Sequence, residues 1–450
     1  MADVIVDPDL LAADVAALVR LPSLSGQERS ALEWLAERAR ALGLEAALRE
    51  HDLAALRAHP DHPGEEAARG ELLTLAVTLP GSLPGRLCLD AHVDVVAPGH
   101  EHWCHGPWSG AIADGCVHGR GAVDMKGGVI AALHALAALR AAGTATPEVV
   151  LLCVPAEEDG GLGTFAALEH DDRFDACLIP EPTGFAVVCA QAGSLTFRGT
   201  VHGRGAHAAF RLEGRSALDR YMAIHAALAA HEARLNSAVA HPAMRALALP
   251  YPLSVGRVEV GEWSSSVPDR LVFEGRLGVR VGEAPAAARA AFEAAVRGAD
   301  ADPELSPVEI GWTGGAFAPG ETDPAHPWVE RVRAAVAAER GDAPVAGVPW
   351  GADMRLFCAR GIPTVMVGTS GIELAHAVDE RVRIDEVAAL ARIVAGAVAA
   401  GPGGYGDGAG WSGRAATRGV RPGPTPGRPP RPPRAAARPG PARGPRNPDR

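Results

Sequence analysis

The chain has 450 residues, 47% of them hydrophobic and 22% charged, which predicts a soluble globular protein of two or three domains. The formal net charge is −11, but residues 411–450 hold ten arginines against one acid, Asp449, a local balance of +9, so the rest of the chain carries −20. This acidic body argues against nucleic acid as its partner. No run of 18 apolar residues predicts a membrane span, and seven scattered cysteines without a C-x-x-C motif predict reduced thiols in the cytoplasm.

Two helices are predicted at the start of the chain. Residues 9–20 and 26–42 have helical patterns, and Ser25 with Glu28 three residues later has the spacing of an N-terminal capping box. The polar stretch 51–70 predicts a loop, and a strand is expected to follow it.

An apolar strand over residues 87–95 presents His92 and Asp94 at its end. Residues two apart along a strand point to the same side, so the two side chains can act together. Histidine is a common metal ligand, and a carboxylate beside it can accept the second ring N–H and fix the tautomer. The pair is therefore a candidate site, although a solvated turn is the commoner explanation of such a tripeptide taken alone.

Two features further along have simple structural explanations. Three histidines and a cysteine are crowded in a turn-rich stretch: His100, His102, Cys104 and His105. Their irregular spacing matches no closed zinc pattern, so we predict an exposed loop. Asp124 precedes a helix predicted over 126–142, and a carboxylate at that position often serves only as a cap or as a partner of the helix dipole.

Three further apolar strands each end close to a carboxylate or an imidazole. They lead to Glu157 and Glu158 after residues 148–155, to Glu181 after 175–180, and to His376 after 362–367. Adjacent acids repel each other unless a cation or a proton lies between them. Because ligands bind at the carboxyl ends of strands in open α/β sheets, the repetition predicts an α/β fold with a site at one sheet edge.

The predicted domain organisation is an α/β catalytic domain in two parts, residues 1–190 and 304–401, interrupted by a smaller segment. The order strand, helix, strand, strand, helix over 191–303 predicts an inserted α+β domain of ferredoxin-like type. Residues 402–450 are rich in Pro, Gly and Arg and are predicted to be a disordered tail, because they cannot bury enough apolar surface to fold.

Six motifs, taken in order, resemble the two-zinc amidohydrolase and exopeptidase family that includes acetylornithine deacetylase, succinyl-diaminopimelate desuccinylase, aminoacylase and carboxypeptidase G. The resemblance covers about residues 10–400, with the inserted segment where that family has its dimerisation domain. The motifs are HVD at 92–94, GRGAVDMKGG at 119–128, EEDGGLGT at 157–164, EPT at 181–183, GRGAHAA at 203–209 and AHAVDE at 375–380.

The resemblance implies two Zn²⁺ ions per subunit, with Co²⁺ or Mn²⁺ as substitutes. One ion would be bound by His92, Asp124 and Glu181, and the other by Asp124, Glu158 and His376, so that Asp124 bridges the two. Three protein ligands for each ion leave room for a shared water, as a catalytic zinc site requires.

The resemblance also implies roles for side chains that are not metal ligands. Asp94 would orient His92, and Glu157 would be the general base that takes a proton from water and returns it to the leaving amine. His207 would reach across a homodimer interface and donate a hydrogen bond to the oxyanion. The substrate would be a small N-acyl amino acid or a short peptide, and neither a membrane nor nucleic acid is expected as a partner of the folded body.

Within this family, the motifs favour a zinc-dependent deacylase most like acetylornithine deacetylase. Succinyl-diaminopimelate desuccinylase, or a dipeptidase or carboxypeptidase, remains an alternative. Ser265 stands where many relatives have Asn, and Arg355, in a D-x-R sequence, either binds a substrate carboxylate or forms a structural ion pair. From another class, a non-catalytic metal-binding homologue would be expected to have lost Glu157, Asp94 or a ligand, and the chain retains them all.

Overall fold

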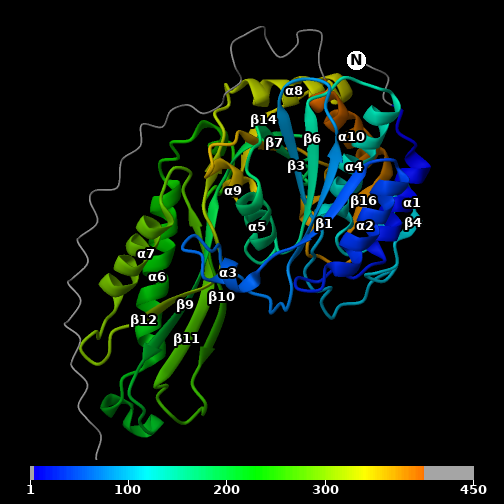
Figure 1. Cartoon of the computed structure of the whole chain (residues 1–450). Helices are drawn as coiled ribbons and strands as arrows, with labels where there is room; N and C mark the ends of the chain where they lie inside the picture. Colours follow the sequence, from blue (N-terminus) through cyan, green and yellow to red (C-terminus); the bar gives the residue numbers. More distant parts are fainter. Residues whose placement is uncertain (1–4, 400–450) are drawn as a thin grey trace, which may run out of the picture. The chain divides into compact units, whose positions relative to one another are not determined.

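A large mixed sheet forms the centre of the computed structural model, which describes residues 5–399 (Figure 1). Within these residues the sheet has nine strands in the order β1-β2-β6-β3-β7-β15-β8-β13, with β14 paired to β8. The strands are β1 (Glu45–Glu50), β2 (Leu73–Leu79), β3 (Arg86–His92), β6 (Glu148–Val154), β7 (Ala176–Ile179), β8 (Val187–Gln191), β13 (Gly320–Glu321), β14 (Val345–Val348) and β15 (Thr364–Met366). The tail predicted over 402–450 lies outside the described residues.

Four neighbouring strands of this sheet run parallel to one another. β3 pairs with β6 on one side and with β7 on the other, and β15 pairs with β7. Their central residues are fully buried, as expected for near-continuous apolar runs covered on both faces. The carboxyl ends of β6, β3, β7 and β15 therefore meet at one edge, which is the edge that ligands use in such sheets.

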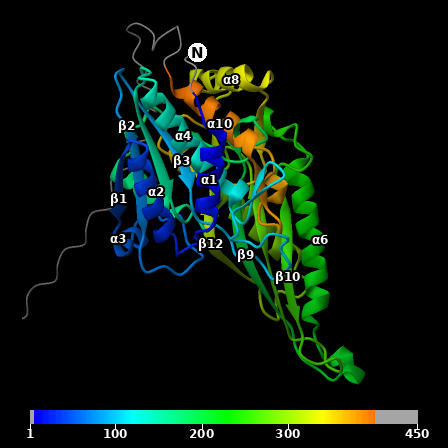
Figure 2. The ribbon, with the colours of Figure 1, turned by 90° about the vertical axis from the view of Figure 1, so that its right-hand side faces the viewer.

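Helices cover both faces of the sheet. α10 contacts α1, α4 and α8, and α1 contacts α4; Figure 2 shows α1, α4 and α10 packed together. α5 and α9 contact each other and lie on the other side of β3 and β6 in Figure 1. The bounds are α1 (Pro8–Val19), α2 (Arg29–Ala41), α3 (Leu53–Arg57), α4 (Gly127–Ala141), α5 (Leu162–His170), α8 (Pro327–Arg340), α9 (Met354–Cys358) and α10 (Ile384–Val398). The short α3 lies in the stretch predicted as a loop.

The capping box predicted at the start of the second helix is wrong. Residue Glu28 occupies the N-cap position of α2, and its side chain makes no capping hydrogen bond to the helix. The Ser25 hydroxyl instead donates to Asp94 Oδ2 at 3.1 Å, while Glu28 Oε1 accepts the N–H of Gly26 at 2.6 Å. The distant Asp94 has taken the Ser25 side chain from the motif, and the neighbouring Gly26 N–H occupies that of Glu28, so spacing alone misled the prediction.

One helical segment, Ala122–Ala141, is long and apolar enough to span a membrane by length and composition. It joins a short π-helical turn, η1 (Ala122–Lys126), to α4, and 83% of its most apolar window is buried inside the protein. Such burial is that of a core helix, and it agrees with the contacts of α4 to α10, α1 and the sheet.

A second, antiparallel sheet has the strand order β10-β11-β9-β12. Its elements in chain order are β9 (Gly193–His202), α6 (Ala217–Asn236), β10 (Leu253–Val260), β11 (Arg270–Val279), α7 (Pro285–Ala299) and β12 (Glu309–Phe317). Aromatic side chains, among them Phe197, Phe273 and Phe292, form its separate core. The β-α-β-β-α-β order is ferredoxin-like, which confirms the predicted fold class.

The boundary predicted at residue 303 is too early for this second sheet. β12 pairs with β9 from Glu309 to Phe317 and completes the ferredoxin-like order. The sequence of β12, EIGWTGGAF, contains three glycines, which weaken its strand pattern. A register shift between Thr313 and Ala316 marks two of them, Gly314 and Gly315, as a bulge.

A small sheet of β16 (Arg381–Arg383), β5 (Cys116–His118) and β4 (Ala111–Ala113) completes the described fold. β16 pairs antiparallel with β5, with Arg381 opposite His118 and Arg383 opposite Cys116. This pairing joins the loop that follows His376 to the loop that precedes Asp124.

Candidate functional site

The parallel strands deliver candidate ligands to one edge of the large sheet. His92 is the last residue of β3, Glu158 follows β6 by four residues, and Glu181 follows β7 by two. His376 comes ten residues after β15, beyond a 3₁₀ turn at Ile372–Leu374. Since these strands run in the same direction, their ends place distant parts of the sequence side by side.

Asp124 lies between the two imidazoles. Its Oδ1 is 3.1 Å from His92 Nε2, and its Oδ2 is 3.7 Å from His376 Nε2. Glu181 Oε1 lies 3.7 Å from His92 Nε2, and Glu158 Oε1 lies 3.0 Å from His376 Nε2. One carboxylate therefore has an oxygen directed toward each histidine, which is the position that a bridging ligand requires.

Two groups of side chains in the described part of the chain converge closely enough to hold metal ions. Their ligand atoms lie within 4.8 Å of one another, and the groups are His92, Asp124 and Glu181, and Asp124, Glu158 and His376. These are the two sets that the sequence motifs implied. Imidazole nitrogens with carboxylate oxygens suit Zn²⁺, Co²⁺ and Mn²⁺, so the donor chemistry fits a two-metal centre.

The electrostatics of these groups also fit bound cations. Burial raises the pKa of Glu181 well above its ordinary value, and the Asp124 carboxylate nearby raises it further. Burial likewise raises the pKa of Glu158. Burial lowers the pKa of His92, but its hydrogen bond to Asp124 and the other carboxylates outweigh this and raise it well above its ordinary value. Clustered buried carboxylates are costly unless protons or cations neutralise them.

Asp94 is completely buried and holds the backbone of the acidic loop. Its Oδ1 accepts the N–H of Glu157 at 3.1 Å and its Oδ2 accepts that of Glu158 at 3.2 Å. His92 Nδ1 lies 3.0 Å from the main-chain oxygen of Asp94 but 3.6 Å from its carboxylate, which is too long for a hydrogen bond. The backbone of Asp94, rather than its side chain, thus orients the His92 ring.

Glu157 lies beside the ligands, with 7% of its surface exposed. Burial raises its pKa well above the ordinary value, and Asp353, Glu181 and Glu158 raise it further. The following turn depends on glycine: Gly161 has φ 76°, and a Cβ there would lie 2.3 Å from Asp353 Oδ1. The sequence after the two acids therefore allows the tight turn that leads into α5.

The other predicted site residues do not belong to these two groups. His207 caps a short 3₁₀ helix, Ala208–Glu213, where its Nδ1 accepts the N–H of Ala209. Ser265 is exposed, and its main-chain oxygen accepts the N–H of Ala208. Arg355 is only 3% exposed and donates to the main-chain oxygens of Ala352 at 3.0 Å and Gly160 at 2.5 Å. Its guanidinium thus supports the acidic loop in this chain.

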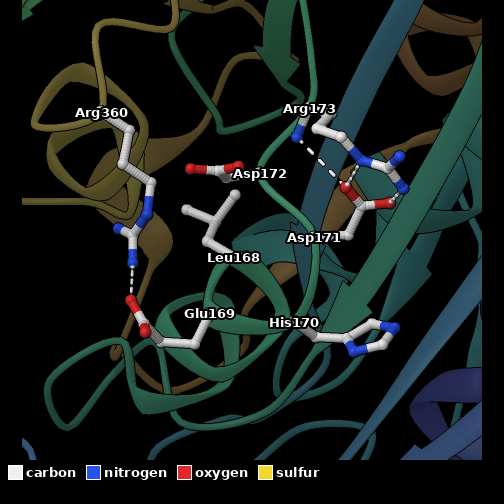
Figure 3. Close-up of a pocket in the computed structure, with 7 residues that line it drawn as sticks. All are labelled: Leu168, Glu169, His170, Asp171, Asp172, Arg173 and Arg360. Atoms are coloured by element: carbon white, nitrogen blue, oxygen red, sulfur yellow. Dashed lines mark hydrogen bonds and ion pairs between the residues drawn. The ribbon is translucent and has the colours of Figure 1, made fainter.

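The histidine-rich loop forms neither metal group of the described residues. His105 stacks near His118, with ring centroids 4.4 Å apart, and Cys104 donates its N–H to Asp379 at 2.7 Å. A surface pocket of about 330 Å³ lies at the end of α5 and beside Arg360, and Figure 3 shows the side chains that line it. Arg360 pairs there with Glu169 at 2.5 Å, Arg173 pairs with Asp171 at 2.7 Å, and no predicted ligand lines the pocket.

Sequence reasoning missed three buried charged residues near the centre. Arg69, in the stretch predicted as a loop, donates to Asp159 at 2.5 Å. Arg120 and Glu380 lie within the motifs but were given no role, and they pair at 2.7 Å. Position inside a motif was the one available signal for the latter pair, whereas nothing in the local sequence marks Arg69.

A parallel-sheet edge that presents two imidazoles and three carboxylates, with one carboxylate shared, defines a metal-dependent hydrolase. Residues 88–400 match the family described as Peptidase family M20/M25/M40. The chain belongs to this family and is a metal-dependent amide hydrolase.

Comparison with individual proteins agrees with this assignment. The chain is 30% identical over 392 residues to the succinyl-diaminopimelate desuccinylase of Gluconacetobacter diazotrophicus, with 84% of this chain and 93% of that protein covered. The M20 metallo-carboxypeptidase Sso-CP2 of Sulfolobus solfataricus has a similar structure, with a TM-score of 0.68, 17% identity, and coverage of 87% and 99%. The YXEP protein of Bacillus subtilis, a dinuclear metal-binding M20 peptidase, gives a TM-score of 0.59 at 17% identity, with coverage of 87% and 97%.

Proposed function

We propose that the chain is a two-metal desuccinylase that hydrolyses the amide bond of N-succinyl-diaminopimelate. The observation that carries this proposal is the pair of ligand groups sharing Asp124, with Glu157 beside them. The relatives support the succinyl substrate better than the N-acetylornithine favoured by the motifs, because desuccinylases match over 84% of the chain.

The proposed metals are two Zn²⁺ ions, replaceable by Co²⁺ or Mn²⁺. They would be held by His92, Asp124 and Glu181, and by Asp124, Glu158 and His376. When bound, such ions polarise the scissile carbonyl and lower the pKa of a bound water. The main-chain oxygen of Asp94 would accept a hydrogen bond from the Nδ1–H of His92, which leaves Nε2 free to act as the ligand atom.

Proton transfer falls to Glu157 in this proposal. Its carboxylate accepts a proton as the water oxygen bonds to the amide carbon, and it donates that proton to the amine nitrogen as the C–N bond breaks. The products are succinate and diaminopimelate. Asp94 fixes the backbone N–H of Glu157, and Arg355 fixes the oxygen of Gly160, so both ends of this loop are held during the transfer.

We further propose that the enzyme is a cytoplasmic homodimer in which His207 of the partner subunit donates to the oxyanion. The residues around His207 support an interface, since Phe210 and Leu212 are 63% and 87% exposed on the same 3₁₀ helix. Ser265, whose main chain bonds to that of Ala208, would contribute to the substrate pocket beside it. Sedimentation velocity tests the dimer, and a monomer with full turnover would contradict it.

The deciding experiment measures hydrolysis of N-succinyl-diaminopimelate, N-acetylornithine and a panel of dipeptides by the metal-loaded protein, with a chelated control. We expect turnover of the succinyl substrate alone. Glu157→Gln should abolish turnover and retain two metal ions, whereas Glu330→Gln, a matched change at an exposed glutamate on α8, should leave both intact. Turnover by Glu157→Gln near the wild-type rate would remove Glu157 from the mechanism. Preferred cleavage of N-acetylornithine would contradict the proposed succinyl substrate.

A further inference from the structure

Glu380 is a buried carboxylate that binds four donors around Asp124. Its Oε2 accepts from Arg120 Nη1 at 2.7 Å and from the N–H of Gly121 at 2.9 Å. Its Oε1 accepts the N–H groups of Val123 at 3.0 Å and Asp124 at 3.3 Å. With 1% of its surface exposed, Glu380 is held away from solvent and fixes the backbone that carries the shared carboxylate.

Arg120 connects the same carboxylate to the loop of His376. Its Nη1 pairs with Glu380, and its Nη2 donates to the main-chain oxygen of His376 at 3.1 Å. The guanidinium lies over the Trp103 ring, 5.2 Å from the centroid, and the residue is 2% exposed. Both hydrogen-bonded ends of this arginine therefore act on segments that carry candidate ligands.

His376 is the candidate ligand that most needs such support. Its side chain is 53% exposed, against 2% for His92 and 5% for Glu181. It also has a positive φ of 62°, which is uncommon for a residue with a side chain and persists only where neighbouring structure holds it. His92, in contrast, is placed by a central strand whose neighbours fix it on both sides.

We propose that Arg120 and Glu380 are positioning residues that hold Asp124 and His376 in place relative to each other. Their loss releases metal selectively from the group Asp124, Glu158 and His376. The inference rests on the two-metal centre of the proposed function. It follows from geometry: the pair contacts segments of two of the three ligands in that group, and contacts the other group only through the shared Asp124. Outer partners of this kind typically alter metal affinity by about 10- to 100-fold.

Two substitutions separate this role from general stability. Glu380→Gln keeps the size of the side chain, but its amide NH₂ would face N–H donors. The hydrogen bonds made by one of the two Glu380 oxygens must therefore be lost. Arg120→Lys keeps the positive charge, yet an ammonium cannot reproduce the planar fork that reaches Glu380 and the His376 oxygen together. Asp300→Asn is the matched control, because Asp300 pairs with the buried Arg220 at 2.7 Å in the other sheet's domain.

The test titrates the purified holoenzyme with chelator and follows Co²⁺ content and the cobalt absorption spectrum, which need no substrate. We expect the wild type and Asp300→Asn to keep two Co²⁺ ions where Glu380→Gln and Arg120→Lys keep one. Combining Glu380→Gln with His376→Ala should release no more metal than His376→Ala alone. Combining it with His92→Ala should release the metal that remains.

Several outcomes overturn the inference. Two tightly bound ions and an unchanged spectrum in both variants would do so, as would equal weakening of both sites. If Glu380→Gln fails to fold, Arg120→Lys alone decides between one ion and two. A wild type that binds two ions but hydrolyses no substrate overturns the proposed function and leaves this test standing, whereas a wild type that binds fewer than two overturns both.

Discussion

Asp94→Asn separates the two roles that a carboxylate next to His92 can have. If the Asp94 side chain oriented the imidazole, its loss would weaken metal binding, as for other outer partners of ligating histidines. In the structure the ring nitrogen bonds to the main-chain oxygen of Asp94, and the carboxylate binds the N–H groups of Glu157 and Glu158. We therefore expect the variant to keep both metal ions and to lose rate through Glu157.

The expected fall in kcat follows from the hydrogen bond that the amide of the Asp94→Asn variant can no longer accept. Asparagine has one acceptor oxygen, so either the Glu157 N–H or the Glu158 N–H meets an NH₂ group. A hydrogen bond to a charged group contributes about 1.5–3 kcal/mol. If this loss appears in the barrier through a displaced Glu157, kcat falls roughly 10- to 150-fold. Ser25→Ala removes only the hydroxyl donor to Asp94 and should have a much smaller effect.

The assay compares kcat, KM and metal content for the wild type, Asp94→Asn and Ser25→Ala. The expected pattern is a lower kcat with KM and two metal ions retained, because the altered loop carries the proton-transfer group. Loss of one metal ion in Asp94→Asn would refute the reasoning and return the side chain to the orientation of His92. A kcat of Asp94→Asn equal to that of the wild type would show that the loop of Glu157 and Glu158 needs no support from the Asp94 carboxylate.

Two further predictions concern stability. Arg69→Met should lower the free energy of unfolding by about 3–5 kcal/mol in urea denaturation, because it leaves the buried Asp159 carboxylate without its cation and with only the N–H groups of Glu66 and Ala67 as donors. Arg29→Met, at an exposed ion pair, should change the free energy of unfolding little, and equal effects would contradict the argument from burial. The second prediction concerns His51, whose pKa burial lowers from 6.5 to about 4. Between these two pH values the unfolded chain binds a proton at His51 that the folded chain excludes. The contribution of neutral His51 to the free energy of unfolding is therefore lost as the pH falls from about 6.5 to 4. The urea midpoint of His51→Gln should fall less over that range than that of the wild type, and parallel curves would exclude this contribution.

The parallel strands, and the polar side chains that follow their ends, could be predicted from sequence because each depends on a local pattern, whereas the two candidate ligand groups were implied by the family resemblance. An uninterrupted apolar run followed by a polar side chain marks a buried strand and its end, as for β6 and Glu158. The ferredoxin-like order was equally visible up to α7. β12 was missed because three glycines interrupt its pattern, and its pairing with β9 is a long-range contact.

The supporting side chains could not be predicted, because their partners are distant in the sequence. Arg120 and Glu380 are 260 residues apart, and Arg69 and Asp159 are 90 apart. Ser25 and Glu28 failed in the opposite way: they have the spacing of a capping box, but their side chains bond to Asp94 and Gly26 instead. Arg355 shows the same difficulty, since its sequence context suits a substrate ligand as well as the buried contact with Gly160 that the structure shows.

Candidate ligand carboxylates and supporting carboxylates differ in what they face rather than in residue type. Asp124, Glu158 and Glu181 direct oxygens toward imidazoles, and cations can occupy the space between them. Asp94 and Glu380 have their oxygens occupied by backbone N–H groups, so they have little capacity left for a metal ion. A carboxylate that binds several N–H groups of one loop restricts that loop at several points, which a single ligand bond cannot do. Substitutions should therefore fall into separable classes: loss of metal for the first set, loss of rate with metal retained for Asp94, and loss of one ion for Glu380.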